Sequence, residues 1–139
     1  MSANADEPEA AGEASSVISI LIVDDDANQR EMYQVRLQRQ GYCVRVAPSA
    51  DLAVQALREQ RPDVIVLDIA MPERDGLSAL QEFLDMDPSL PVVIHTAYPA
   101  YADNFLAWAA DAYVQKTSDL GPLLDAIHKA VGRSQRENQ

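Results

Sequence analysis

Short apolar runs alternate along the chain with stretches in which apolar residues recur at helical spacing. The first run, Val17–Val23, is β-branched and nearly continuous, which indicates a strand buried on both faces. Residues 42–46 alternate between apolar and polar side chains, as is typical of a strand nearer the edge of a sheet. Three further strands are predicted at residues 63–68, 91–96 and 111–115.

A helical pattern follows each predicted strand. The expected helices cover residues 27–40, 49–60, 77–84, 100–110 and 119–132. Gly41 stands where a left-handed residue commonly ends a helix, and Ser49 is a good N-cap for the second helix. The inner face of that second helix is expected to hold Leu52, Ala53, Ala56 and Leu57.

Five strand–helix units joined by short connections predict an α/β fold, with a parallel sheet and helices on both faces. In such a sheet, ligands bind beyond the carboxyl ends of the strands, near the point where the strand order switches. Any chemistry should therefore lie at that edge.

The two ends of the chain lack this pattern. Residues 1–16 are rich in Ala, Glu and Ser and are expected to form a disordered acidic tail, while residues 133–139 read as a short polar tail. The folded domain should then span residues 17–132. No secretory signal and no apolar stretch of about 20 residues is visible, so we expect a cytoplasmic protein without a membrane span.

Charge and cysteine content narrow the class further. The formal net charge of −11 argues against nucleic-acid binding, which normally needs a basic face. The single cysteine, Cys43, excludes a disulfide within the chain and fits a reducing compartment.

Polar residues gather where the predicted strands end. They are Asp24, Asp25 and Asp26 after the first strand, Asp68 at the third, Thr96 at the fourth, and Lys116 after the fifth. Carboxylates brought together repel one another and need a cation. Ligands that are all oxygen select a hard ion, and a small number of carboxylates favours Mg²⁺ over Ca²⁺.

This set of side chains suits phosphoryl transfer. An aspartate can attack phosphorus and form an aspartyl phosphate. The ammonium of Lys116 would contact one phosphoryl oxygen and the hydroxyl of Thr96 another. Asp26 is better explained as a helix cap.

The chain also resembles the receiver domain of response regulators, from about Ile18 to Val131. The matching segments are Ile20–Asp26, Val66–Pro72 with Asp75 and Gly76, His95–Ala97, and Tyr113–Lys116. Four motifs in this order, each ending a predicted strand, are specific together. The resemblance implies a flavodoxin-like doubly wound (βα)5 fold with strand order 2-1-3-4-5.

The resemblance also implies roles by position. Asp68 matches the phosphoacceptor and Lys116 the lysine that contacts the phosphate. Asp25, Asp68 and the backbone carbonyl of Ala70 match the direct metal ligands, and Asp24 matches the acid that acts through a bound water. Thr96 and Tyr113 match the switch pair.

The same resemblance implies partners. A sensor histidine kinase or phosphotransfer protein would supply the phosphoryl group. An unknown output protein would bind the face made by the fourth helix and fifth strand. The chain would be a phosphoacceptor switch and not an enzyme, able to phosphorylate itself from small donors and to lose the group again, as a monomer or weak dimer.

One departure from the family pattern matters. Thr117 follows Lys116 where the family commonly has proline after a cis bond, so that bond could be cis or trans. Residues 100–110 carry two apolar rows, which fit either a buried helix or a partner surface. Tyr98 is a candidate shield of the phosphoryl group against water.

Two other functions stay open on the sequence. One is an interaction module of the same fold that is never phosphorylated. The other is a phosphohydrolase resembling the haloacid dehalogenase class, because Asp24–Asp26 superficially matches that class's DxD segment, although Asn28 departs from its pattern.

Overall fold

The computed structural model describes residues 17–70, 76–97 and 109–137. Within these residues, five strands form one sheet in which each neighbouring pair is parallel. The strands are β2 (Ser19–Val23), β3 (Cys43–Ala47), β4 (Val64–Leu67), β5 (Val92–Thr96) and β6 (Ala112–Gln115). Their spatial order is β3-β2-β4-β5-β6, which is order 2-1-3-4-5 along the chain and confirms the predicted fold.

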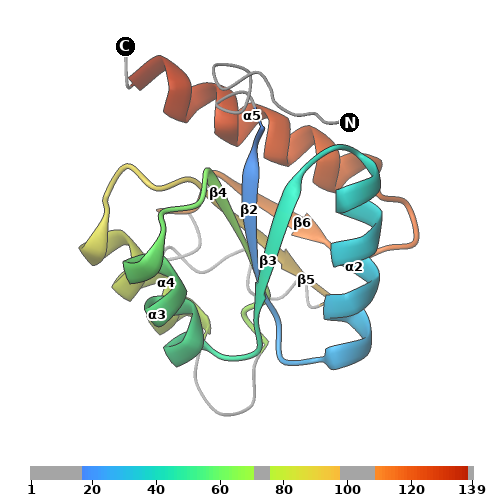
Figure 1. Cartoon of the computed structure of the whole chain (residues 1–139), viewed down its shortest axis with the longest axis horizontal. Coiled ribbons are helices and arrows are strands. Elements are labelled where there is room, and N and C mark those ends of the chain that lie inside the picture. Colours follow the sequence, from blue (N-terminus) through green and yellow to red (C-terminus); the bar gives the residue numbers. More distant parts are fainter. Residues whose placement is uncertain (1–16, 71–75, 98–108, 138–139) are drawn as a thin grey trace, which may run out of the picture.

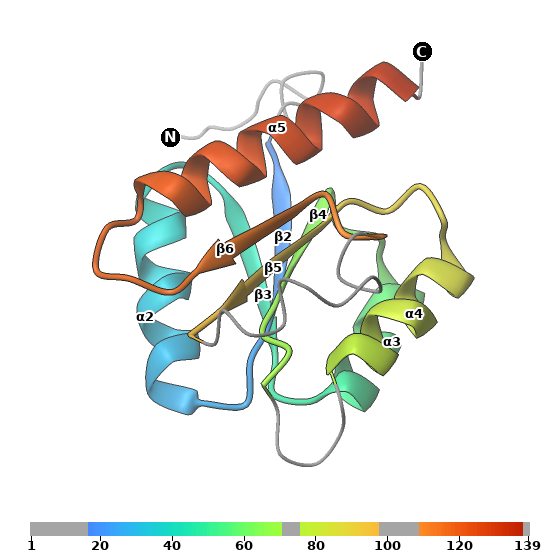
Figure 2. The same cartoon turned by 180° about the vertical axis from the view of Figure 1, so that it is seen from behind.

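Helices cover both faces of the sheet. They are α2 (Ala27–Arg39), α3 (Ala50–Glu59), α4 (Gly76–Met86) and α5 (Gly121–Glu137). Figures 1 and 2 show α3 and α4 together on one face, with α2 and α5 on the other. Among the described helices, none is long and apolar enough to cross a membrane. Residues 98–108 lie outside the described ranges, so the predictions for Tyr98 and for most of the 100–110 helix are not tested.

The predicted helix caps are present. The Asp26 carboxylate accepts hydrogen bonds from the backbone N–H groups of Asn28 and Gln29, at 3.0 and 3.1 Å. Ser49 Oγ accepts one from the Leu52 N–H at 3.2 Å. Gly41, just after α2, has φ of 97°, a conformation that glycine adopts without a steric penalty. Asp26 is therefore a helix cap, as predicted.

Two apolar cores lie on opposite faces of the sheet. Phe83 and Leu67 belong to the core under α3 and α4, and Leu37 and Ile127 to the core under α2 and α5. The side chains of β2, β4 and β5 are almost all buried, which agrees with their continuous apolar sequences. The sheet, with its carboxyl edge, thus lies between two layers of helices.

The burial of α3 differs from the prediction at one position. Leu52 is 47% exposed, while Val54 is buried beside Ala53. The inner face follows positions 50, 53, 54 and 57, and Leu52 lies off this stripe in the first turn. The expectation that Leu52 packs inward was wrong.

The last helix is longer than its apolar pattern predicts. α5 continues to Glu137, although no apolar residue follows Val131. The guanidinium of Arg133 pairs with the carboxylate of Asp111, the residue directly before β6. This ion pair ties the turn of α5 that holds Arg133 to the sheet. Much of the segment read as a polar tail is therefore helical.

Candidate functional site

The candidate site lies between β2 and β4, where the strand order switches. After β2 the chain turns to β3 on one side, and β4 then pairs with β2 on the other. The backbone N–H of Asp24 donates to the Ala47 carbonyl at 3.1 Å, and that of Asp68 donates to the Val23 carbonyl at 2.9 Å. Both acids are thus fixed by the sheet itself, at the edge where ligands of such folds bind.

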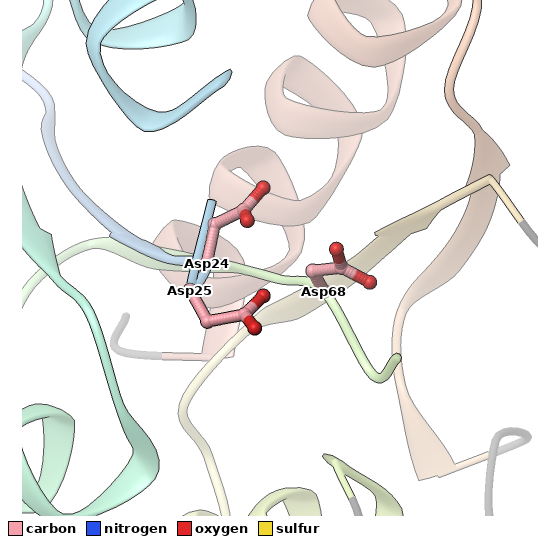
Figure 3. Close-up of side chains that lie close together, drawn as sticks. All are labelled: Asp24, Asp25 and Asp68. Atoms are coloured by element: carbon pink, nitrogen blue, oxygen red, sulfur yellow. The ribbon is translucent and has the colours of Figure 1, made fainter. Parts of the chain in front are cut away.

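Three carboxylates converge there. Oxygen atoms from Asp24, Asp25 and Asp68 all lie within 4.8 Å of one another. Figure 3 shows Asp24 and Asp25 after one strand and Asp68 at the end of its neighbour. Asp24 and Asp68 are buried and Asp25 is exposed. The predicted juxtaposition of strand-end acids is present.

Lys116 directly follows β6, the outermost strand, and its side chain extends along the carboxyl edge of the sheet to this cluster. Its ammonium donates to Asp24 Oδ2 at 2.7 Å and to Asp68 Oδ2 at 2.9 Å, and its side chain is only 8% exposed. Its backbone N–H donates to the Thr96 carbonyl at 2.7 Å, and no peptide bond in the described residues is cis, so the bond to Thr117 is trans. One ammonium against three carboxylates leaves the cluster with an excess of negative charge.

The remaining carboxylate oxygens are unequally engaged. Asp24 Oδ1 accepts from the Asp26 N–H at 2.9 Å, so both of its oxygens have protein partners. Asp68 Oδ1 accepts from the Ala70 N–H at 2.9 Å. Asp25 makes no hydrogen bond or ion pair with the described residues. A donor set made only of oxygen, with one unengaged carboxylate, fits a hard divalent cation such as Mg²⁺.

Burial and charge shift the pKa values of several groups. Burial raises the pKa of Asp24, against the opposing hydrogen bond from Lys116. Burial alone would lower the pKa of Lys116, but its bonds to Asp24 and Asp68 outweigh this and hold the pKa above its usual value. Burial, helped by the charge of Lys116, lowers the pKa of His95 to about 4.

His95 is a buried core residue beside the site. Its ring meets the ring of Tyr33 edge-on, with centroids 4.8 Å apart. His128, in contrast, is exposed on α5. One histidine thus packs in the core and the other lies on the surface of the molecule.

Thr96 and Tyr113 lie on adjacent strands. Thr96 is fully buried at the end of β5, and Tyr113 is half-buried on β6, where it pairs in register with Ile94. Thr96 follows Ile94 by two residues, so Thr96 and Tyr113 share the α3/α4 face of the sheet. Tyr113 packs against the core of that face.

Two residues of the site were not predicted. The Oε1 atom of Gln29 accepts a hydrogen bond from the Lys116 ammonium, and Arg30 Nη1 donates to the Asp24 carbonyl at 2.9 Å. Both belong to the first turn of α2. The only available signal was the position of that turn directly after the acidic segment, which brings it over the same edge of the sheet.

A doubly wound sheet with an acidic cluster and a buried lysine at its switch point defines a receiver domain. The chain belongs to the response regulator receiver domain family, whose model matches residues 20–128. This confirms the family inferred from the motifs, and with it a place in two-component signalling.

Two curated relatives are transcriptional regulators. TcrX of Mycobacterium tuberculosis, a probable transcriptional regulatory protein, is 37% identical over 101 residues, which are 71% of this chain and 43% of TcrX. ZraR of Escherichia coli is 35% identical over 119 residues, 84% of this chain and 27% of ZraR. The chain thus spans less than half the length of either relative.

Solved structures give the same fold. The response regulator TrrA of Thermotoga maritima, in complex with Mg(2+)-BeF, has a TM-score of 0.79 and 32% identity, covering 82% of this chain and 99% of TrrA. TrrA in complex with the histidine kinase ThkA has a TM-score of 0.77 at the same identity, covering 82% of this chain and 98% of the matched chain.

Proposed function

We propose that this receiver domain accepts a phosphoryl group on Asp68 from a partner histidine kinase or phosphotransfer protein, in a reaction that requires Mg²⁺. The observation that carries the proposal is the ammonium of Lys116, bonded to Asp68 Oδ2 inside a cluster of three carboxylates. The similarity to TrrA, whose structures include Mg(2+)-BeF and a histidine kinase, supports both the ion and the class of donor.

Asp25, Asp68 and the backbone carbonyl of Ala70 would bind the ion directly, with Asp24 acting through water. When bound, Mg²⁺ offsets negative charge on the attacking and transferred oxygens. The carboxylate of Asp25 supports this assignment, since it lies in the cluster and has no counter-charge of its own among the described residues.

The chain's own residues would carry the transfer. An Asp68 oxygen attacks phosphorus as the bond from phosphorus to the donor breaks, and the donor leaves with the electron pair of that bond. The Lys116 ammonium, already beside Asp68, would pass to a phosphoryl oxygen of the product. The Thr96 hydroxyl would donate to another. Small donors such as acetyl phosphate would serve the same reaction. Water would later attack the acyl phosphate, which releases inorganic phosphate and restores the Asp68 carboxylate.

The new charge would then change a partner surface. Thr96 would move toward the phosphoryl group and the Tyr113 ring would follow inward, altering the face near β6 that we propose as the site for an output protein. The half-buried position of Tyr113 on the same face as Thr96 supports this pairing. We place the switch in the cytoplasm, as a monomer or weak dimer.

The absence of nucleic-acid binding stays a prediction for this chain. TcrX and ZraR are transcriptional regulators, but the matched part is less than half of each. The net charge of −11 is the observation that argues against DNA contact by this domain.

The phosphohydrolase alternative loses its main support. In that alternative Asp26 would complete a catalytic pair with Asp24, yet the Asp26 carboxylate caps α2. The unphosphorylated interaction module is the remaining rival, and it shares the fold.

Intact-mass measurement after incubation with acetyl phosphate separates these two functions. The wild-type chain should gain the mass of one phosphoryl group when Mg²⁺ is present, and Asp68→Asn should gain none. A wild-type chain that stays unmodified with acetyl phosphate and with a phosphorylated histidine kinase would favour the interaction module.

A further inference from the structure

The ammonium of Lys116 has three acceptors, and only two of them are acids. Asp24 and Asp68 accept two of its hydrogen bonds, and the amide oxygen of Gln29 accepts the third. An ammonium carries three N–H donors, so this set satisfies the group completely. With 8% of the side chain exposed, water has little access to replace a lost acceptor.

Gln29 is held in place from its own helix. Its backbone N–H is bonded to the capping carboxylate of Asp26, at 3.1 Å. Asp26 also donates its N–H to Asp24, while Arg30 bonds the Asp24 carbonyl. The bonds from Gln29 and Arg30 therefore tie the first turn of α2 to the acidic segment, which is itself held by the bond between Asp26 and Asp24, so the backbone of Gln29 is fixed.

Gln29 carries no charge, so it can bind the Lys116 ammonium in a way that Asp24 and Asp68 cannot. Asp24 and Asp68 are expected to face the metal ion, and Asp68 changes its chemistry when it is phosphorylated. A neutral amide keeps its hydrogen-bonding capacity in both states and adds no charge that would repel an incoming phosphate.

We propose that Gln29 is a positioning residue, which holds the Lys116 ammonium beside Asp68 through the phosphoryl-transfer cycle. The inference rests on the proposed function for its effect on the reaction, but the contact itself can be tested without any phosphorylation. Gln29 does not touch the reacting atoms and acts through Lys116.

The test compares Gln29→Met with Gln38→Met. Both substitutions remove a glutamine amide from α2 and keep a residue of similar length and helix propensity, but Gln38 is exposed and remote from the site. Thermal unfolding of the two variants first establishes that both fold.

The contact is tested by amine labelling. The sequence holds only two lysines, Lys116 and the exposed Lys129, so residue-level mass spectrometry with an N-hydroxysuccinimide ester gives a labelling ratio with an internal standard. We expect the ratio of Lys116 to Lys129 labelling to rise severalfold in Gln29→Met and to match wild type in Gln38→Met. Equal ratios in the two variants would overturn the contact.

The effect on the reaction is tested by the rate of phosphorylation from acetyl phosphate with Mg²⁺. Gln29→Met should react about tenfold more slowly than wild type, the change produced by about 1.4 kcal/mol at the transition state. If its rate equals that of Gln38→Met while wild type is phosphorylated, Gln29 has no positioning role. If wild type itself is not phosphorylated, the proposed function fails, and the labelling ratio still decides the contact.

Discussion

At the scale of single residues, the site carries an excess of negative charge, and the hydrogen bonds of the sheet fix two of its acids in place. Asp24 and Asp68 are buried at strand ends and share one ammonium, while Asp25 faces the same point without a partner among the described residues. Burying like charges is costly unless something compensates them. Lys116 supplies part of this compensation, and a divalent ion would supply the rest.

Asp25→Asn should separate metal binding from folding. Asp25 is exposed, so solvent screens part of its attraction for the ion, and we expect Mg²⁺ affinity to fall about tenfold or more. Without metal, stability should stay equal or rise slightly, because an unpartnered repulsive charge is removed. Calorimetric Mg²⁺ titration and thermal unfolding measure the two effects, with Asp125→Asn on the outer side of α5 as control. A large loss of metal-free stability would contradict this account.

His95 should make stability depend on pH. Its pKa is about 4 in the folded chain and 6.5 without the fold, so the unfolded state binds the proton first as pH falls. The stabilisation present above pH 6.5 is then lost between pH 6.5 and 4, by at most roughly 3 kcal/mol.

His95→Gln should remove this slope. Chemical denaturation across pH 7 to 4 would show a smaller loss of unfolding free energy in His95→Gln than in wild type. His128→Gln, which removes the exposed imidazole on α5, serves as control and should follow wild type. Parallel curves for wild type and His95→Gln would refute the prediction.

At the scale of elements, most of the fold follows from local sequence. β2 and β4 were predictable because their apolar runs are continuous, and α2 because Asp26 and Gly41 mark its two ends. The end of α5 was not, since its last turns carry no apolar residue and one of them is tied by Arg133 to Asp111. The spacing of apolar residues indicates which positions are buried. It does not predict a polar helix end that is held by an ion pair to a distant residue.

The candidate site shows the same division. Strand-end positions sufficed to bring Asp24, Asp68 and Lys116 together, because parallel strands share a carboxyl edge. The bond between Gln29 and Lys116 joins residues 87 positions apart and depends on rotamers, which no sequence pattern encodes. The roles that come from the family resemblance, such as those of Ala70 and Tyr113, stay predictions.

Arg45 joins the edge strand β3 to the end of α3. From β3, its guanidinium donates to the carbonyls of Ala56 and Gln60 at the end of α3, at 3.3 and 2.7 Å. The Gln60 carbonyl belongs to the end of the helix and has no helical partner, while the Ala56 carbonyl accepts from Arg45 in addition to the Gln60 N–H.

Arg45→Met should therefore lower the free energy of unfolding by about 1.5–3 kcal/mol, the usual net contribution of a hydrogen bond to a charged group. Urea denaturation measures the change. Arg58→Met, which removes an exposed arginine from the last turn of α3, should cost clearly less. An equal loss in both variants would mean that the Arg45 bonds do not stabilise α3.

At the scale of the whole molecule, helices pack on both faces of the sheet, and the acidic cluster lies at its carboxyl edge. TrrA shares this fold, at a TM-score of 0.79. Backbone hydrogen bonds of the sheet hold Asp24 and Asp68 in place, while the half-buried Tyr113 lies on the outer strand β6, where a rearrangement can reach the surface. This division suits a switch that couples a buried modification to a partner.

The central claim is that one particular carboxylate becomes the acyl phosphate. Borohydride reduction converts an aspartyl phosphate to homoserine, so peptide mass spectrometry after reaction with acetyl phosphate locates the modified residue. If Asp68 is the phosphoacceptor, we expect homoserine at position 68 in the presence of Mg²⁺ and none after Mg²⁺ is removed with a chelator. Homoserine at position 24 or 25 instead, or at position 68 irrespective of the metal, would contradict it.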